Sequence, residues 1–269
     1  MKLRVLVDNN TYIDHYYLGE PGASYYIEID NKKLLLDTGY SGVVVDNARK
    51  MDIDLSKLDK IIISHGHDDH TKGLVKIIED FNTSKMELIS HPDAFYPKRA
   101  REGDVGSPLR SSDIAEKFKY NPSKKPFNIT ENCIFLGEIP EYFDFEKRRV
   151  LGEREIDGKL EDDYMIDDSA IVCKLKDGIF IITGCSHSGI CNIVEHAKKV
   201  CNDDRIVGII GGFHLFKTDE RLKNTIDYFL DNNVGIVYPC HCTSLGVKSE
   251  ILKYYDFDEI GVGFKLEIE

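Results

Sequence analysis

The sequence predicts an α/β fold in which short strands and helices alternate. Short runs rich in β-branched residues are followed by longer segments in which apolar residues recur every three or four positions, the spacing of one helix face. Gly, Asn and Asp residues punctuate the chain between these runs. The same order occurs on both sides of a charged middle part, 92–167. Taken alone, this periodicity indicates the α/β class and no particular arrangement of layers.

The first half is expected to begin with a strand at 1–8. Ser24–Asp30 and Lys33–Asp37 are predicted to form a hairpin, because Asn31 and Lys32 between them suit a tight turn. The elements expected next are a helix at 41–51, a buried strand at 59–64, a helix at 71–81 and a strand at 86–90.

The second half repeats this pattern. Strands are expected at 170–175 and 179–183, separated by the turn Lys176-Asp177-Gly178. A helix at 189–201, a strand at 206–210, a helix at 219–231, a strand at 235–238 and a helix at 245–255 follow. Two halves of this kind favour two sheets covered by helices, with functional loops at one edge.

The middle part, 92–167, interrupts this order with most of the prolines and with dense charges. It could be a surface insertion without a role, or a lid over the functional site, because long insertions in compact domains are often functional. Its basic clusters include Arg99, Arg101, Arg148 and Arg149. These side chains could receive a phosphate or carboxylate group of a substrate.

Length and composition are those of a globular protein that buries a substantial core. The 269 residues are 42% hydrophobic and 30% charged, and no run approaches the roughly 20 apolar residues of a membrane span. The first residues are charged too soon for a signal peptide and are expected to form a strand. Seven cysteines without such a signal indicate a reducing compartment, so we expect a cytoplasmic protein.

The balance of charge restricts the class of partner. A net charge of −12 argues against a nucleic-acid-binding surface, which needs a basic face. We therefore expect a small-molecule substrate, an anionic one in view of the local basic clusters, and neither a nucleic acid nor a membrane. The oligomeric state stays open, with a dimer among the options.

One motif dominates the chemistry of the chain. Residues 64–73 read Ser-His-Gly-His-Asp-Asp-His-Thr-Lys-Gly, directly after an expected buried strand. Alternation along an extended chain places His65 and His67 on one side, and the following turn brings Asp69 and His70 to a second position close by. Neutral imidazole and carboxylate are ligands that Zn, Mn and Fe accept. The motif therefore predicts a metal site rather than a surface turn with incidental histidines.

This motif is similar to His-x-His-x-Asp-His, the signature of the metallo-β-lactamase superfamily. The chain resembles in particular the branch labelled 7,8-dihydropterin-6-methyl-4-(β-D-ribofuranosyl)aminobenzene 5′-phosphate synthase-like. The segments that carry the resemblance, besides the motif, are Asp37-Thr38-Gly39, Gly184–Ile190, Gly211–Leu215 and Pro239–Thr243. The resemblance implies an αββα four-layer sandwich, a single domain over 1–269, and a charged cap at 92–167 over the metal site.

The resemblance also implies two divalent metal ions, with Zn favoured and Mn or Fe as alternatives. His65, His67 and His187 are expected to hold one ion, and Asp69, His70 and His241 the other. Many members of the superfamily carry Gly-Asp where this chain has Gly184-Cys185, so the bridging ligand is in question. Cys185 could ligate as a thiolate, which would favour a soft metal, or it could simply be buried.

Several further residues are candidates for the site. His91 and Asp168 are alternatives as metal or bridging ligands, although a substrate-facing histidine and a solvated turn explain them as well. Asp37 is expected to fix the second ring nitrogen of a metal-bound imidazole. Cys240 and Cys242 are expected to face away from His241, because side chains alternate along a strand, which argues against a separate Cys-x-Cys zinc site.

These residues predict a hydrolase that uses a metal-bound hydroxide on a small anionic ester or phosphoester. Asp69 is expected to orient the hydroxide and accept its proton, and His214 to contact the substrate or donate a proton. The branch label implies an alternative, a transferase that joins a dihydropterin diphosphate to an aminobenzene ribofuranosyl phosphate with loss of diphosphate. An alternative of another class is a ligand sensor that has the fold without catalysis.

Overall fold

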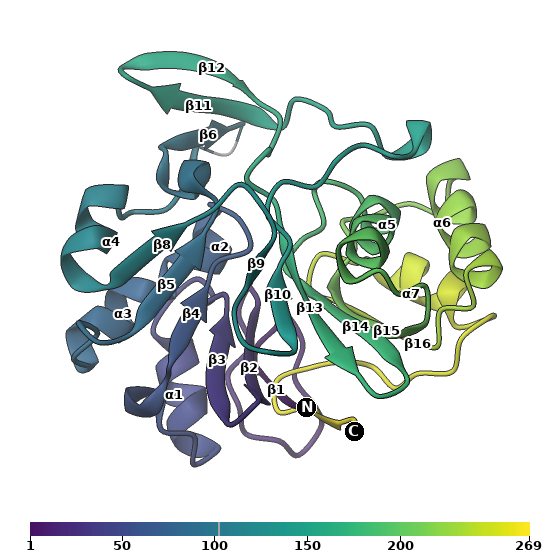
Figure 1. The fold of residues 1–269 in the computed structure, drawn as a ribbon, viewed down its shortest axis with the longest axis horizontal. Helices are drawn as coiled ribbons and strands as arrows, with labels where there is room; N and C mark the ends of the chain where they lie inside the picture. Colours follow the sequence, from purple (N-terminus) through teal and green to yellow (C-terminus); the bar gives the residue numbers. More distant parts are fainter. Residues whose placement is uncertain (102) are drawn as a thin grey trace.

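Two mixed β-sheets pack face to face, and helices cover the outer face of each sheet (Figure 1). The structure, a computed structural model, describes residues 1–101 and 103–269. The layers follow the order helix, sheet, sheet, helix. This arrangement confirms the predicted α/β class and the αββα sandwich that the resemblance implies.

The first sheet has the strand order β17-β1-β2-β3-β4-β5-β8. Its strands are β1 (Lys2–Val7), β2 (Ser24–Ile29), β3 (Lys32–Leu36), β4 (Lys60–Ile62), β5 (Glu87–Ser90), β8 (Lys119–Pro122) and β17 (Lys265–Glu267). The predicted hairpin is β2–β3, and its turn residues Asp30 and Asn31 have φ angles of 53° and 57°. Such left-handed turns match the twist of the paired strands. From β3 onward the neighbouring strands are parallel, so their carboxyl ends meet at one edge.

The second sheet has the strand order β16-β15-β14-β13-β10-β9. Its strands are β9 (Phe127–Asn128), β10 (Cys133–Phe135), β13 (Ala170–Leu175), β14 (Gly178–Thr183), β15 (Ile206–Gly212) and β16 (Ile236–Cys240). The predicted turn at Lys176-Asp177-Gly178 joins the antiparallel pair β13–β14. Strands β14, β15 and β16 run parallel, so they too end at a common edge.

Helices flank the sheets as the apolar periodicity predicts. They are α1 (Val43–Lys50), α2 (Asp68–Thr71), α3 (Gly73–Asp80), α4 (Ser111–Lys117), α5 (Ile190–Cys201), α6 (Glu220–Asp231) and α7 (Leu245–Ile251). In Figure 1, α1, α3 and α4 lie on one side of the sandwich and α5, α6 and α7 on the other. The sequence predicts all of these except α2 and α4.

Three buried clusters hold the layers together. The inner cluster joins side chains of both sheets, among them Ile27, Leu34, Phe135 and Phe180. The two outer clusters lie between a sheet and its own helices, and Phe229 of α6 belongs to one of them. Burial of apolar surface at about 25 cal/mol per Å² is the main stabilising term in such layers.

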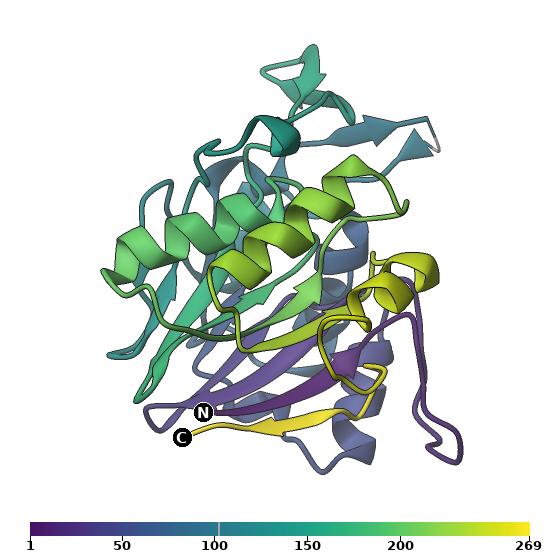
Figure 2. The same ribbon diagram turned by 90° about the vertical axis from the view of Figure 1, so that its right-hand side faces the viewer.

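The predicted cap at 92–167 is too broad. Strand β8 extends the first sheet, and β9 and β10 extend the second, because apolar side chains such as Ile134 complete the core there. A separate small sheet remains, with the order β12-β11-β6-β7 and the strands β6 (Lys98–Ala100), β7 (Gly103–Asp104), β11 (Gly152–Ile156) and β12 (Lys159–Asp163). It projects beyond the sandwich (Figures 1 and 2).

The two ends of the chain lie together at one edge of the sandwich (Figure 2). Strands β1 and β17 pair antiparallel, and the amino group of Met1 donates to the carbonyl of Ile268 at 2.6 Å. Within 1–101 and 103–269, no helix has both the length and the apolar character that a membrane crossing requires.

Candidate metal centre

The candidate site lies where strands of both sheets end at the same edge. Asp37 follows β3, and His65 follows β4 after a short link. Cys185 follows β14, and His241 follows β16. The strand carboxyl ends of the first sheet thus face those of the second, so residues far apart in sequence meet in one place.

The backbone is left-handed at several of these strand ends. The φ angles are 59° at Asp37, 58° at Ser186, 49° at His214 and 46° at His241. Such values are rare for residues other than glycine, and they cluster at functional sites where the surroundings enforce them. At each of these positions the backbone turns sharply after the strand, which changes the direction of the side chains that follow.

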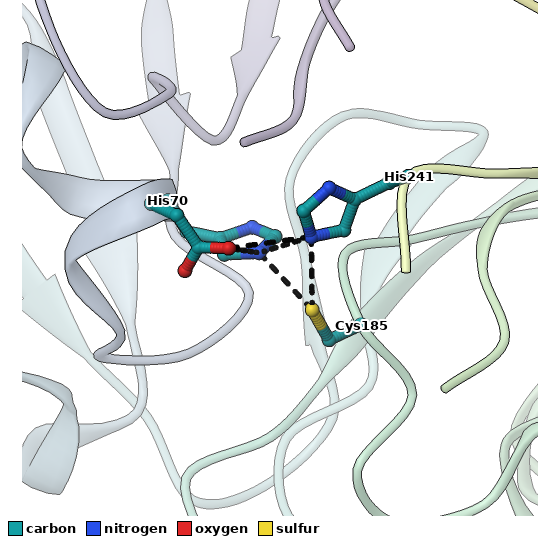
Figure 3. Close-up of side chains that lie close together, drawn as sticks. His70, Cys185 and His241 are labelled. Carbon is teal, nitrogen blue, oxygen red and sulfur yellow. Dashed lines mark hydrogen bonds and ion pairs between the residues drawn. The ribbon is translucent and has the colours of Figure 1, made fainter. Parts of the chain in front are cut away.

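One group of potential ligands consists of Asp69, His70, Cys185 and His241, whose ligand atoms all lie within 4.8 Å of one another. Figure 3 shows His70, Cys185 and His241 of this group pointing toward one another. The Sγ atom of Cys185 lies 3.2 Å from Nε2 of His70 and 3.2 Å from Nε2 of His241. The two imidazole Nε2 atoms are also 3.2 Å apart. Asp69 Oδ2 lies 3.4 Å from Nε2 of His241.

A second set of imidazoles lies beside the first. His65, Cys185 and His187 form one group of potential ligands, and His65, His67 and Asp69 form another. Nε2 of His65 lies 3.2 Å from Nδ1 of His67, and the ring centroids of His65 and His187 are 4.8 Å apart. The groups overlap through Cys185 and Asp69, which lie between the two sets of imidazoles.

The rings are held so that one nitrogen of each faces the cluster. Asp37 Oδ2 lies 2.7 Å from Nδ1 of His70, and Ser64 Oγ lies 2.9 Å from Nδ1 of His65. Asn9 Oδ1 lies 2.8 Å from Nδ1 of His241. Metal-binding histidines are typically oriented through their other nitrogen in this way.

The residues present fit divalent metal ions. Both ring nitrogens of His187 are buried and have no hydrogen-bond partner within the described residues. An unpaired buried imidazole is costly, and a metal ion would satisfy it. Converging imidazole, carboxylate and thiol groups are also the donor set of transition-metal sites. We therefore treat the cluster as a candidate metal centre.

Burial keeps several imidazoles neutral, which is the form that binds metal. It lowers the pKa of His65 and of His187 well below the ordinary value. It also lowers the pKa of His67 to about 4, despite the opposing effect of Asp69.

The pKa values of His70 and Asp69 shift in the directions that favour their charged forms, because the two opposite charges attract each other. Burial lowers the pKa of His70, but Asp69 and Asp37 outweigh it and raise that pKa to about 9. Burial raises the pKa of Asp69, but His70 and His241 outweigh it and lower that pKa below its ordinary value. Without metal, a proton on His70 stabilises this part of the cluster, and metal binding would displace it.

His214 borders the cluster without joining a ligand group. Its ring centroid lies 4.4 Å from that of His187. Burial and then the nearby Arg221 lower the pKa of His214 to about 4, so its imidazole is neutral at pH 7. It lines a cavity of about 390 Å³ together with His67, Asp69, Cys185, His187, His241 and others. His214 can therefore offer an N–H group to a bound molecule, whereas a proton-donating imidazolium would need a higher pKa.

Two of the alternative ligands are not in the cluster. His91 is buried, with Nδ1 accepting from the Asp93 N–H at 3.0 Å and Nε2 at 2.9 Å from Glu138 Oε1. Asp168 is also buried rather than solvated, and its Oδ2 accepts from the Ser188 N–H at 2.8 Å. Burial raises the pKa of Asp168 to about 6. Asp168 thus contacts the backbone next to His187.

Of the four arginines predicted to bind substrate, Arg149 lines a cavity at the site within the part of the chain that the structure describes. Arg99 is exposed and pairs with Asp104 at 2.9 Å, and Arg101 is exposed directly after β6. Arg148 donates to the Ile139 carbonyl at 2.7 Å and to Ser188 Oγ at 3.0 Å. Arg149 lines a cavity that His187 and His214 also line.

The sequence analysis did not identify Ser64 and Asn9, and its prediction for Cys242 was wrong. Ser64 precedes the motif, and its Oγ donates to Asp37 Oδ2 at 2.7 Å. Cys242 lines the cavity, contrary to the expectation that it faces away from His241. The left-handed backbone at His241 breaks the strand alternation on which that expectation rested. Burial raises the pKa of Cys242, but Cys185 and His241 outweigh it and lower that pKa to about 7.

The small sheet supports the motif from outside. Lys98 Nζ is buried between Asp163 Oδ2 at 2.8 Å and Asp167 Oδ1 at 2.9 Å. The other oxygen of Asp167 accepts from the Gly66 N–H at 2.8 Å, between His65 and His67. Asp167, which belongs to 92–167, thus contacts the backbone of the motif, whereas β8, β9 and β10 of the same range extend the two large sheets.

Comparison with known proteins places this site in a family context. Residues 18–186, more than half of the chain, match the Metallo-beta-lactamase superfamily. The uncharacterized protein MJ0448 of Methanocaldococcus jannaschii is 32% identical over 257 residues, which cover 95% of each chain. The 7,8-dihydropterin-6-methyl-4-(beta-D-ribofuranosyl)-aminobenzene-5′-phosphate synthase of the same organism is 27% identical and covers 98% of this chain and 95% of its own.

A solved structure agrees over the whole chain. The crystal structure of Tm1679, a metal-dependent hydrolase of the beta-lactamase superfamily, superposes with a TM-score of 0.84. The two sequences are 29% identical, and the match covers 100% of this chain and 99% of Tm1679. The comparison of sequences and the comparison of structures therefore indicate the same superfamily.

Proposed function

The chain belongs to the metallo-β-lactamase superfamily, and on this basis we propose that it is a dinuclear metal-dependent hydrolase of a small anionic ester or phosphoester. Its similarity to Tm1679, a metal-dependent hydrolase, supports the hydrolase class. We expect one ion to be held by His65, His67 and His187, and the other by Asp69, His70 and His241.

Two observations together carry this proposal. The Sγ atom of Cys185 belongs to ligand groups on both sides of the cluster, and the buried imidazole of His187 has both nitrogens without a described partner. A packed core would leave neither feature, because buried polar atoms are normally paired. A pair of metal ions would satisfy both.

In the proposed reaction, different residues of the chain have different roles. When bound, the divalent ions supply Lewis acidity that activates water and stabilises developing negative charge. Asp69 is ionised at neutral pH and can orient the attacking water and accept its proton. The neutral His214 offers a hydrogen bond to the substrate. Asp37 and Ser64 hold His70 and His65 in place.

The donor set favours zinc. A thiolate at Cys185 beside several imidazoles is softer than the carboxylate that many family members carry there, and soft ligands select Zn over Mn. Burial raises the pKa of the Cys185 thiol, so in the metal-free state the thiol keeps its proton. Ligation would release that proton, because the thiolate is the binding form.

The test is metal content on anaerobically purified protein, followed by a screen of esters and phosphodiesters. We expect about two equivalents of metal in the wild type and about one in His241→Ala, with hydrolysis lost in that variant. His15→Ala, which removes an exposed histidine that belongs to none of the ligand groups, is the matched control. Metal content below one equivalent in the wild type would contradict the proposal and favour a ligand sensor.

The transferase alternative is supported by one relative. The synthase of Methanocaldococcus jannaschii matches 98% of this chain at 27% identity. Labelled water separates the two reactions, since a hydrolase places solvent oxygen in a product, whereas a transferase releases diphosphate and places no solvent oxygen in the joined product. Diphosphate release that requires a second organic substrate would overturn the hydrolase proposal in favour of the transferase.

A further inference from the structure

A second cavity, of about 300 Å³, adjoins the metal centre. It is lined by Lys147, Arg149, Leu151, Tyr164, His187, His214, Leu215, Phe216, Lys217, Asp219 and Arg221. His187 and His214 line both this cavity and the one at the metal centre. A molecule held in the second cavity would thus contact the imidazoles that border the metal centre.

The lining is cationic although the chain is acidic. Four cationic side chains line the cavity: Lys147, Arg149, Lys217 and Arg221. Among the described residues that line it, Asp219 is the one carboxylate. The chain as a whole, in contrast, has a net charge of −12. The Asp219 side chain is engaged at the start of α6, where it accepts from the Leu222 N–H at 3.3 Å. The cavity therefore concentrates positive charge in one place.

Three of these cations form no ion pair within the described residues, although Arg221 partly offsets the rise that burial causes in the pKa of Glu146. Lys147 pairs with Asp144 at 2.7 Å, but within the described residues Arg149, Lys217 and Arg221 have no carboxylate within 4.0 Å. The Nε atom of Arg221 is buried and has no hydrogen-bond partner among them. A buried guanidinium donor without an acceptor is unfavourable, and an anion in the cavity would compensate its charge.

Apolar surface lies beside these charges. Leu151, Tyr164 and Phe216 are 41%, 45% and 57% exposed, and all three line the cavity. The ring of Phe216 packs edge-on against His214, with centroids 4.9 Å apart. Exposed aromatic side chains next to a few charged groups are typical of small-molecule sites, in which the apolar surface holds the ligand body.

We propose that this cavity binds a phosphate group of the substrate that is separate from the bond broken at the metal centre. Three unpaired cations suit a phosphate monoester, which carries about two negative charges and three acceptor oxygens, better than a single carboxylate. Arginine side chains also match phosphate geometry with paired donors. Tyr164 and Phe216 contact the apolar part of the same molecule. The inference rests on the proposed function and narrows its substrate class to phosphorylated compounds.

The first test measures binding of inorganic phosphate by calorimetric titration. The proteins are the metal-loaded wild type, His67→Ala, the double variant R149Q/R221Q and Lys217→Gln. Phosphate should bind the wild type and His67→Ala alike, and about tenfold or more weakly to the double variant, since each charge-assisted hydrogen bond contributes to affinity. Lys217→Gln, at an exposed position, should weaken binding in the same direction.

Arg205→Gln is the matched control, because Arg205 is exposed and pairs with Asp203. Phosphate binding that disappears in His67→Ala and is unchanged in R149Q/R221Q would overturn the proposal, since the anion would then bind at the metal centre. Absence of phosphate binding to the wild type, or equal binding of acetate, would overturn it as well.

A second test uses pairs of aryl esters that differ only in a remote phosphate group. R149Q/R221Q should lower the ratio of kcat/KM for the phosphorylated ester to kcat/KM for its partner about tenfold or more. Equal reductions for both esters would overturn the proposal. A wild type that hydrolyses neither ester would refute the proposed function, while the phosphate titration would still decide the inference about the cavity.

Discussion

Oδ2 of Asp37 lies 2.7 Å from Nδ1 of His70, although 33 residues separate the two in the chain. The same carboxylate accepts from the Ser64 N–H and from Ser64 Oγ, each at 2.7 Å. Ser64 Oγ in turn contacts Nδ1 of His65 at 2.9 Å. One buried carboxylate thus orients an imidazole on each side of the cluster, directly at His70 and through Ser64 at His65.

Replacing Asp37 should weaken metal binding without removing a ligand. We expect Asp37→Ala to lower metal affinity about 10–100-fold, because ring orientation and imidazole basicity depend on such partners. Competition with a chromogenic chelator measures the affinity. Asp46→Ala, on the exposed face of α1, is the control. An unchanged affinity in Asp37→Ala would show that the imidazoles are held by other contacts.

There is no room for a side chain at Gly184 in the candidate metal centre. A Cβ atom there would collide with Ser64 Oγ and would lie 2.7 Å from Asp37 Oδ2. We expect Gly184→Ala to displace this pair, so that metal content falls and the melting temperature drops. Gly246→Ala is the control, since a Cβ atom at Gly246 would meet nothing within 4 Å. Equal metal content in both variants would contradict the expectation.

Cys185 should decide which metal the centre prefers. Cys185→Asp replaces a soft donor by a hard one, and we expect the Zn to Mn ratio after loading with equal amounts of both to fall. Elemental analysis measures the ratio. The half-buried Cys201 on α5 provides the control Cys201→Ser. If Cys185→Asp and wild type load the same ratio, Cys185 is a packing residue and not a ligand.

Lys98 should stabilise the fold in a pH-dependent way. Lys98→Met leaves Asp163 and Asp167 buried without their cation, which we expect to cost about 3–5 kcal/mol of unfolding free energy at neutral pH. Burial raises the pKa of Asp167, but Lys98 outweighs it and lowers that pKa below the ordinary 3.8. The contribution is therefore present above about pH 4 and is lost as the pH falls through the lowered value.

Urea unfolding of wild type and Lys98→Met at several pH values checks this expectation. The difference between them should be largest near pH 7 and should shrink below about pH 4. Lys117→Met removes an exposed lysine paired with Glu116 and should change stability by less than about 1 kcal/mol. A difference that is constant with pH would contradict the role assigned to Lys98.

Metal removal should destabilise the whole sandwich, because the candidate ligands come from both sheets. At a free metal concentration 100 times Kd, the expected loss on chelation is about 2.7 kcal/mol. Differential scanning calorimetry with and without chelator measures it. In His241→Ala the effect of the chelator should be smaller. Identical melting temperatures with and without chelator would argue against resident metal.

The elements that the sequence predicts correctly are those with a strong local signal. The hairpin around Asp30 and Asn31 and the helix capped by Asp219 are examples, since turn residues and apolar period act locally. Strand β10 pairs with β13 across 40 residues at Cys133 and Cys173, and no local pattern indicates that pairing. This is why the middle part was predicted as one separate cap.

In the candidate site too, the residues that the sequence predicts correctly are those with a local signal. The motif His65 to His70 is contiguous, so its clustering follows from the sequence. The position of Cys242 depends on the left-handed backbone at His241, and that of Asn9 on the loop after β1. Arg221 reaches the second cavity from the start of α6. Such placements depend on tertiary packing, which the spacing of residues does not reveal.

The paired ends of the chain have a practical consequence. Met1 and Ile268 are hydrogen-bonded at the edge where β3 starts, whereas the metal centre lies where β3 ends. A short peptide linker could therefore join the two ends into a ring, and the ring could be reopened at the exposed β11–β12 turn, where Gly158 has open space around it. A circular permutant of this kind should fold, since no strand of either large sheet would be cut.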